Sequence, residues 1–512
     1  MGLIFKLAFR NIRRHRGQSL VIGAILFLGS LMMTMGNGVV SGMERGLRRT
    51  VAHGFTGDLV VLPKGQLSDN VFMEMMGRAV EPLYGYPALK AALDSNPLVT
   101  AHLPIGKGTV MVINEDDGPS VFLYLIGVDF ARYAEVFPDN LRMLEGGLPR
   151  AGAAGLLLPT GARKDIQRQA NLWFRTRQAG PDTAGMDDDA RLHTADLSRK
   201  TDMVLMGFND GNTATDVRLP VDGIFRYRAL NSIFGSFALT DIESFRRCTG
   251  YFTDAERSQG RLSGKDSVLL ALDEKGMDAL LGGDAMPPEP IVLAEAAPVT
   301  ATPVPAAPAA APEAALESGA YNMVLLILRD GVVPDKAAKA LNAYFAERNL
   351  AVRAVTWQKA LGPIGSMAIL IKAALTLFVT FLFVVAIIII VNTLTMAALE
   401  RTPELGMMRA IGARKGFIAR MFLAETTVLS ALFGGLGIGA GAAGILVIEA
   451  IRLTSDNDML QLAFGGDTFR PVLVSGDFLL AVAQLALVTL FAVAYPVMLA
   501  RKVSALDAVY RE

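Results

Sequence analysis

The chain has little of what disulfide-stabilised and metal-binding proteins need. Its 512 residues contain one cysteine, Cys248, which excludes an internal disulfide framework and a thiolate metal cluster. The four histidines, His15, His53, His102 and His193, are scattered without the spacing of metal ligands. The phosphate-binding pattern G-x-x-x-x-G-K-[ST] is missing, so we expect no ATP hydrolysis by this chain itself. G-x-S-x-G, H-E-x-x-H and C-x-x-C patterns are missing as well.

An excess of charge of either sign is also missing. Lys and Arg total 49 and Asp and Glu total 49, so the net charge is zero and no nucleic-acid partner is indicated. Hydrophobic residues make up 52% of the chain, and the mean hydropathy is +0.38. Together with long apolar runs, these values place the chain among membrane proteins.

One apolar run is long enough to cross a bilayer as a helix. It is AALTLFVTFLFVVAIIIIV, Ala373–Val391, interrupted by Thr376 and Thr380. At about 1.5 Å per residue, a helix of this length spans a hydrocarbon core of roughly 30 Å. We therefore predict a membrane helix over 367–394, followed by a loop at 395–420.

The loop contains the signals of a second, short helix. Thr402 can cap its start, Pro403 occupies a first-turn position where proline is tolerated, and Glu404 lies at the positive end of the helix dipole. Leu405, Met408 and Ile411 recur three apart on one face, and Gly412 can end the helix in a left-handed conformation. Basic residues surround this helix: Arg401, Arg409, Arg414, Lys415 and Arg420. From this pattern alone, a helix lying on the lipid surface is the alternative to a docking helix.

The segment ERTPELGMMRAIGARKGFIARMFLAE, Glu400–Glu425, resembles the characteristic loop of FtsX-like ABC transporter permeases. That family includes the lipoprotein-releasing LolC and LolE permeases and the MacB-type efflux permeases. The resemblance implies that the short helix is a coupling helix that docks on an ATPase. The coupling residues it implies are Thr402, Pro403, Glu404, Leu405, Gly406, Met408, Arg409, Ile411 and Gly412.

Three further spans are predicted. The first, 18–40, follows a basic lead-in at 1–17, and we interpret it as a retained helix rather than a cleavable signal peptide, because no A-x-A-type cleavage site follows. LAFRNIRRHRGQSL within the lead-in resembles the family's basic segment before its first helix. The others cover 421–450 and 476–500, and 421–450 is rich in glycine. Glycines four apart allow close helix approach in lipid, either within the chain or to a second copy: Gly435, Gly437, Gly439 and Gly441.

Polar residues within these spans have simple explanations. Glu425 and Glu449 lie close enough to the span ends to be solvated. Asn392 is expected to hydrogen-bond between helices, and Lys372 to reach the interface from the outer end of its helix.

The predicted fold is a membrane α-helical protein of four transmembrane helices with a large extracytoplasmic α+β domain between the first two. The positive-inside bias places both termini, the loop 395–420 and the tail 501–512 in the cytoplasm of a bacterial inner membrane, and the loop 451–475 outside. Arg45, Arg48 and Arg49 are exceptions to this bias, which long translocated domains escape.

The external segment 41–366 has the pattern of a folded domain. Val110–Ile113 and Val121–Gly127 predict two strands around a turn, and the acidic cluster Glu115–Asp117 is interpreted as a solvated turn because it lacks calcium-ligand spacing. Strands are also predicted at Ser267–Leu272, Asn322–Leu328 and Ala351–Val355, with a helix at Asp335–Arg348 before the last of them. Proline and alanine dominate 286–316, which predicts an exposed, disordered insertion.

The resemblance implies a permease subunit that needs partners. These are a cytoplasmic ABC ATPase dimer, a second permease as homodimer or heterodimer, lipoprotein or lipid-like cargo, and a possible periplasmic acceptor. No cofactor is expected in this chain, since ATP and Mg belong to the ATPase. The family also leaves open MacB-type efflux and an FtsX-like regulator of a cell-wall hydrolase. A receptor without energy coupling is a third alternative, but it gives the short helix no purpose.

Overall fold

The computed structural model describes residues 10, 13–14, 16–73, 80–116, 118–138, 140–150, 152–177, 197–208, 214–228, 230–251, 319–400, 407–408, 411–455, 457, 460–461, 464 and 466–502. The chain divides into two compact units, one of Met1–Thr50 with Pro363–Glu512 and one of Val51–Gly362. The predicted strand Ser267–Leu272 and the alanine–proline insertion 286–316 lie outside the described residues.

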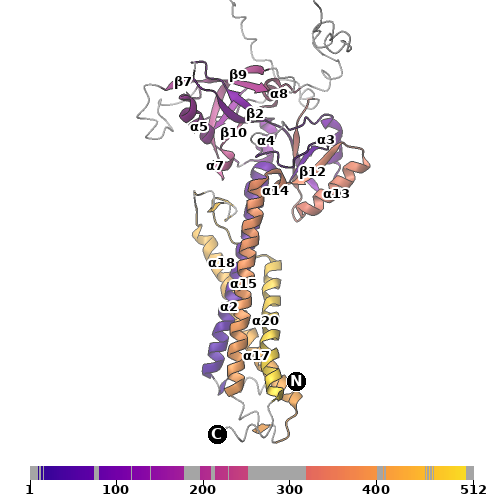
Figure 1. Cartoon of the computed structure of the whole chain (residues 1–512), viewed down its shortest axis with the longest axis vertical. Helices are drawn as coiled ribbons and strands as arrows, with labels where there is room; N and C mark the ends of the chain where they lie inside the picture. Colours follow the sequence, from indigo (N-terminus) through magenta and orange to yellow (C-terminus); the bar gives the residue numbers. More distant parts are fainter. Residues whose placement is uncertain are drawn as a thin grey trace, which may run out of the picture. The chain divides into compact units, whose positions relative to one another are not determined.

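The first unit is a bundle of apolar helices that run side by side (Figure 1). Its elements are α2 (Arg16–Leu47), α15 (Pro363–Glu400), α17 (Lys415–Leu429), the π-helix η3 (Ser430–Gly434), α18 (Gly435–Ile451) and α20 (Ser475–Lys502). The π-helix η1 (Arg48–Thr56) directly follows α2 and carries the chain into the second unit.

Among the described residues, three helical segments are long and apolar enough to cross a membrane: Arg16–Thr56, Pro363–Met396 and Gly416–Ile451. A shorter apolar stretch, Ser475–Phe491, begins α20 where the fourth span was predicted. Four spans therefore stay a prediction. The glycine-rich helix contains a π segment, η3, that periodicity did not indicate.

Apolar side chains from four helical segments form the core of the bundle. Ile22, Leu26 and Met33 of α2 pack with Ile390 and Leu394 of α15, Leu429 of α17 and Val488 of α20. Polar side chains join the same helices: the Asn37 amide donates to Gln484 over 3.1 Å, and the hydroxyls of Ser430 and Thr489 are hydrogen-bonded. Such bonds satisfy groups that would otherwise face hydrocarbon.

The prediction for the two glutamates was half wrong. Glu425 of α17 is buried within the bundle, with 5% of its surface exposed, because the helix turns that side toward its neighbours. Glu449 of α18 is exposed, as predicted. Lys372 contacts Glu44 of α2 over 2.8 Å, and Asn392 is exposed rather than enclosed between helices of this chain.

The second unit contains a ten-stranded mixed sheet in the order β12-β1-β11-β2-β3-β10-β5-β9-β4, with β8 pairing both β2 and β9. The strands are β1 (Leu59–Pro63), β2 (Val99–Val112), β3 (Val121–Val128), β4 (Leu141–Gly146), β5 (Leu156–Pro159), β8 (Asp202–Phe208), β9 (Ala214–Tyr227), β10 (Phe237–Asp241), β11 (Met323–Leu328) and β12 (Val352–Thr356). A separate parallel pair is formed by β6 (Leu172–Phe174) and β7 (Ser198–Lys200).

Strand β2 belongs to both halves of this sheet. Its first half pairs with β11, through register partners such as Leu103 and Leu325, and its second half pairs with β3, from Gly106 opposite Gly127 to Val112 opposite Val121. The predicted hairpin is therefore confirmed, although β2 begins earlier than the pattern indicated. The predicted order of strand, helix and strand near position 340 is also confirmed, by β11, α13 (Pro334–Glu347) and β12.

Short helices complete the unit: α3 (Tyr86–Asp94), α4 (Phe130–Val136), α5 (Thr160–Ala170), α7 (Asn231–Phe234), α8 (Ile242–Thr249) and α14 (Trp357–Ala360). The packing of α8 depends on glycines in the strands beneath it. A Cβ at Gly106 or Gly127 would lie 2.2 or 2.4 Å from the Phe245 side chain, so glycine is required for the ring to lie on the sheet.

The last turn of η1 is enclosed by aromatic rings of the second unit. The Phe55 ring stacks on Phe234 with centroids 4.1 Å apart and meets Phe72, Tyr227 and Phe237 at 5.4, 5.5 and 5.4 Å. Phe55 is 3% exposed. We call these four surrounding residues the aromatic cage. Since tilted and stacked ring pairs are each favourable, the cage anchors η1 in this unit.

Candidate functional site

Most of the predicted coupling helix lies outside the described residues. This applies to Thr402, Pro403, Glu404, Leu405, Gly406 and Arg409. Met408, Ile411 and Gly412 are described. The amide of Ile411 donates to the Met407 carbonyl over 3.1 Å, and that of Ala413 donates to the Met408 carbonyl over 3.0 Å. Gly412 has φ +101°, so the helical turn ends at a glycine of positive φ, as predicted.

The described coupling residues point in two directions. Met408 packs against a small core of α17 formed by Ile418, Met421 and Phe422. Ile411 is 89% exposed, and Met407, one turn earlier, is 61% exposed. The apolar surface available to a partner thus contains Met407 and Ile411, which we call the coupling face, whereas Met408 fixes the turn to α17. Met407 was not among the predicted coupling residues; its four-residue spacing from Ile411 places both on one helix face.

This segment is part of a larger match. Residues 376–505 match the family model described as FtsX-like permease C-terminal. The chain carries an FtsX-like permease domain. The permease domain covers α15 from residue 376 onward and all of α17, α18 and α20, and so includes the coupling face.

Curated relatives match this chain over short stretches. The macrolide export ATP-binding/permease protein MacB 2 of Aeromonas hydrophila is 28% identical over 153 residues, 28% of this chain and 23% of that protein. The ABC transporter permease YtrF of Bacillus subtilis is 47% identical over 55 residues, 11% of this chain and 13% of that protein. The chain therefore aligns with less than a quarter of either relative. Among solved structures, the periplasmic region of MacB from Actinobacillus actinomycetemcomitans aligns with 59% of this chain and 91% of that one, at 10% identity and a TM-score of 0.27.

The four glycines predicted to serve helix packing separate into two faces of α18. A Cβ at Gly437 would lie 2.3 Å from the Phe27 carbonyl oxygen, and one at Gly441 would lie 2.8 Å from Thr34 Cβ. These glycines serve contact with α2 of the same chain. A Cβ at Gly435 or Gly439 would have no atom within 4 Å, so this pair faces away from that contact. Packing within the chain therefore accounts for Gly437 and Gly441. Packing against a second copy stays a prediction for Gly435 and Gly439.

No metal site is formed by the described part of the chain, since no group of three or more His, Cys, Asp or Glu side chains is placed to hold an ion there. The lone Cys248 is buried, and burial, with a smaller effect of Asp216, raises the pKa of its thiol to about 12. A thiol of this kind is unreactive at neutral pH.

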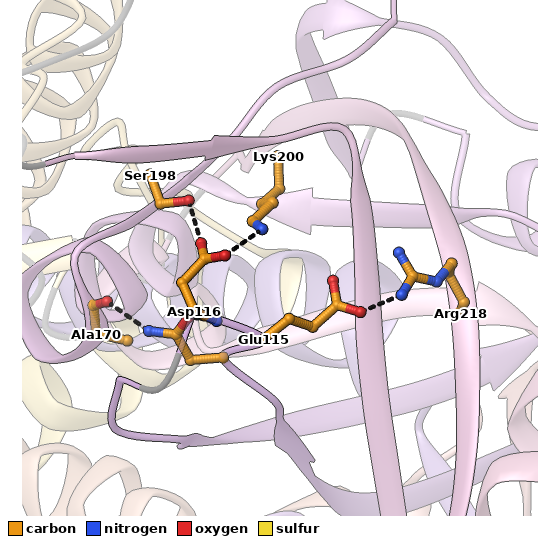
Figure 2. Close-up of polar contacts among 7 residues, drawn as sticks. Glu115, Asp116, Ala170, Ser198, Lys200 and Arg218 are labelled. Carbon is orange, nitrogen blue, oxygen red and sulfur yellow. Dashed lines mark hydrogen bonds and ion pairs between the residues drawn. The ribbon is translucent and has the colours of Figure 1, made fainter. Parts of the chain in front are cut away.

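The acidic turn between β2 and β3 is tethered rather than merely solvated (Figure 2). Asp116 accepts hydrogen bonds from Ser198 Oγ over 2.6 Å and Lys200 Nζ over 2.9 Å, both on β7. Glu115 forms an ion pair with Arg218 of β9. Asp117 lies outside the described residues. The predicted turn is confirmed. Its carboxylates also bind cations of two other strands, β7 and β9, which lie about a hundred residues away in sequence.

We expect Asp116→Asn to increase amide hydrogen exchange in β7 at neutral pH while leaving β9 unchanged. The hydrogen bonds from Ser198 and Lys200 hold the pKa of Asp116 below its usual value of 3.8. A lowered carboxyl pKa contributes stability above the usual value, and this stability is lost as the pH falls through the lowered one. The wild-type chain should therefore show the same increase only below about pH 3.8. Exchange followed by mass spectrometry, corrected for intrinsic rates, tests this, with Glu115→Gln as the matched control that should affect β9 alone. If amide exchange in β7 were the same in both variants, the proposed role of Asp116 in holding β7 would be contradicted.

Proposed function

We propose that this chain is the membrane subunit of an ABC transporter of the inner membrane, with both termini in the cytoplasm and Val51–Gly362 outside. The observation that carries the proposal is the permease domain at 376–505 with an exposed apolar coupling face at its short loop. Exposed Met407 and Ile411 are suited to a partner's apolar cleft, because burying these two side chains there would remove apolar surface from water.

In the proposed mechanism a separate ATPase dimer binds ATP and Mg, closes, and pushes on the segment Thr402–Gly412. Met408 transmits this push to α17, because its side chain is packed into the Ile418, Met421 and Phe422 core. The adjoining helix α15 carries the movement across the membrane and on to the extracytoplasmic unit. No aqueous channel is needed for this type of mechanotransmission.

A second permease subunit completes the assembly. Only 6% of the most apolar stretch of α15 is buried, against 39% for the stretch in α2. Exposed Asn392 lies in the same helix, and a polar amide in hydrocarbon favours a hydrogen-bonding partner helix. These features support pairing through α15, with an identical or a related permease.

The cargo we propose is lipoprotein or another lipid-like molecule taken from the outer leaflet and passed to a periplasmic acceptor. The sequence of the strand–helix–strand segment that ends at Trp357 resembles that of the lipoprotein-releasing branch, and this resemblance supports the choice. MacB-type efflux is the second candidate, because curated relatives are named macrolide export proteins.

Co-purification tests the coupling role. The tagged chain is expressed with the ATPase encoded nearest to it, and we expect the ATPase to be retained by the wild type and lost from Met407→Glu/Ile411→Glu. Two carboxylates on the coupling face would have to be desolvated in an apolar interface. Leu67→Glu/Phe122→Glu is the matched control, since both residues are exposed apolar side chains of the other unit. Retention of the ATPase by the coupling-face variant, or no ATPase with the wild type, would contradict the proposed mechanism.

A further inference from the structure

Exposed arginines gather at the end of the first unit where α2 passes into η1. Arg45 lies in the last turn of α2 and Arg49 lies one turn later in η1, and both are exposed. Residues one turn apart share a face of a helix, so the two guanidinium groups belong to one surface. This is the location where the sequence departs from the positive-inside bias.

The loop after α18 brings two more arginines together. Thr454 and Thr468 form an antiparallel bridge, and the Phe469 amide donates to the Leu453 carbonyl over 2.8 Å. Arg452 precedes Leu453 and Arg470 follows Phe469, so the two arginines flank this hydrogen bond, and both are exposed. The two arginines therefore start from neighbouring positions of the loop backbone.

The loop lies directly on the last turns of α2. The Val472 amide donates to the Gly38 carbonyl over 3.0 Å, and a Cβ at Gly42 would be 2.5 Å from the Arg470 carbonyl oxygen. Arg470 thus lies beside the turn of α2 that precedes Arg45. The backbone contacts thus place four exposed arginines from three segments in one neighbourhood, which we call the arginine cluster: Arg45, Arg49, Arg452 and Arg470.

Neighbouring carboxylates are mostly occupied elsewhere. Glu44 pairs with Lys372 over 2.8 Å, and Asp477 accepts from Ser41 Oγ over 2.8 Å and from the Val474 amide over 2.9 Å. Within the described ranges no ion pair joins a carboxylate to the arginine cluster, and the acids left nearby are Glu449 and Asp467. Asp456 and Asp458 of the same loop lie outside the described residues.

We propose that the arginine cluster binds the phosphate groups of anionic phospholipids in the outer leaflet. This inference rests on the topology of the proposed function, which places this end of α2 at the extracytoplasmic interface. Guanidinium groups form bidentate hydrogen bonds with phosphate oxygens, and clustered cations at a membrane surface attract anionic headgroups. A permease that takes lipid-like cargo from that leaflet would thereby hold anionic lipid beside the outer end of α2.

The backbone of Arg452 gives independent support. It has φ +51° and ψ 61°, a left-handed conformation at the end of α18 where glycine is favoured. Glycine would adopt this conformation with less strain, so a substitution here separates the effect on the backbone from the effect of the guanidinium charge. Arg452→Gly should therefore keep or raise the thermal stability of the chain and weaken lipid binding, whereas a purely structural role predicts no effect on binding.

The test is native mass spectrometry of the full chain in non-ionic detergent, titrated with phosphatidylglycerol or with phosphatidylcholine. We expect a variant with glutamine at all four positions of the cluster to lose roughly tenfold or more in affinity for phosphatidylglycerol, with no change for phosphatidylcholine. The matched control replaces four exposed arginines of the other unit by glutamine, at Arg142, Arg150, Arg226 and Arg329. Unchanged affinity in the cluster variant, or an equal loss in the control, would overturn the proposal.

Two further arms separate the sources of phosphate and the sides of the membrane. Soluble glycerol phosphate should fail to displace phosphatidylglycerol; displacement at equal concentration would mean a free-phosphate site and would overturn the lipid proposal. Arg49→Cys should react with an impermeant maleimide on intact spheroplasts, since the native Cys248 is buried. Reaction only after lysis would overturn the outer-leaflet placement, and it would do so whether or not the ATPase co-purifies.

Discussion

Replacing Phe55 by alanine is expected to destabilise the unit Val51–Gly362 by about 3–5 kcal/mol. The ring is 3% exposed and contacts all four residues of the aromatic cage, so its removal leaves a cavity that rigid rings fill poorly. Phe55→Leu keeps much of the volume but loses the ring pairs, and should give an intermediate loss. The cage joins residues from β9, β10, α7 and the loop after β1, and Phe55 is the one aromatic side chain of η1 that reaches it.

Urea unfolding of the full chain in detergent measures this effect. The chain's two tryptophans, Trp173 and Trp357, are both buried in this unit, so their fluorescence reports its unfolding without a signal from the helical bundle. Phe122→Ala is the matched control: its ring is 68% exposed, and a change of about 0.5 kcal/mol or less is expected. A loss for Phe55→Ala no larger than that of the control would show that the cage does not hold η1.

Local patterns predicted the elements whose formation depends on nearby residues. Alternation on either side of a polar turn indicated the β2–β3 hairpin, and the apolar run before Asn392 indicated α15. The glycine stop was also predictable, because Gly412 follows a short helical turn and tolerates the positive φ that ends it. In each case the deciding interactions lie within a few residues of one another.

Features that depend on distant residues could not be predicted in this way. Phe55 meets Tyr227 and Phe237 only because the sheet places β9 and β10 beside η1. The tether of Asp116 needs Lys200 from a strand that no pattern connected with the turn. Burial of Glu425 depends on the rotation of α17, which a window near a span end does not determine.

The arginine cluster has the same origin. Its four members are scattered in the sequence, because Arg452 and Arg470 are separated by a loop and both are distant from α2. A bridge between Thr454 and Thr468, together with the close approach at Gly42, brings them together. The order of these residues along the chain therefore gave no sign that they lie together.

Gly437→Leu is expected to disrupt the bundle, by about 3 kcal/mol or more, whereas Gly439→Leu is expected to leave it intact. At Gly437 the first added carbon would lie 2.3 Å from a backbone oxygen of Phe27, and backbone cannot move aside as a flexible side chain can. At Gly439 no atom lies within 4 Å of the same position, so a leucine there extends away from α2. The two substitutions add the same apolar side chain to one helix, which makes each the control for the other.

Thermal unfolding in detergent tests the internal face of α18 at Gly437, and cross-linking in membranes tests the open face at Gly439. Gly437→Leu should lower the apparent Tm and the yield of folded chain, because the contact between α2 and α18 is internal to the protomer. Gly439→Leu should keep the wild-type Tm; if Gly435 and Gly439 pack against a second permease, it should also reduce the cross-linked dimer. An unchanged dimer would assign that face to lipid and leave α15 as the proposed site of pairing. A Tm equally lowered in both variants would contradict the division of the glycines into an internal and an open face.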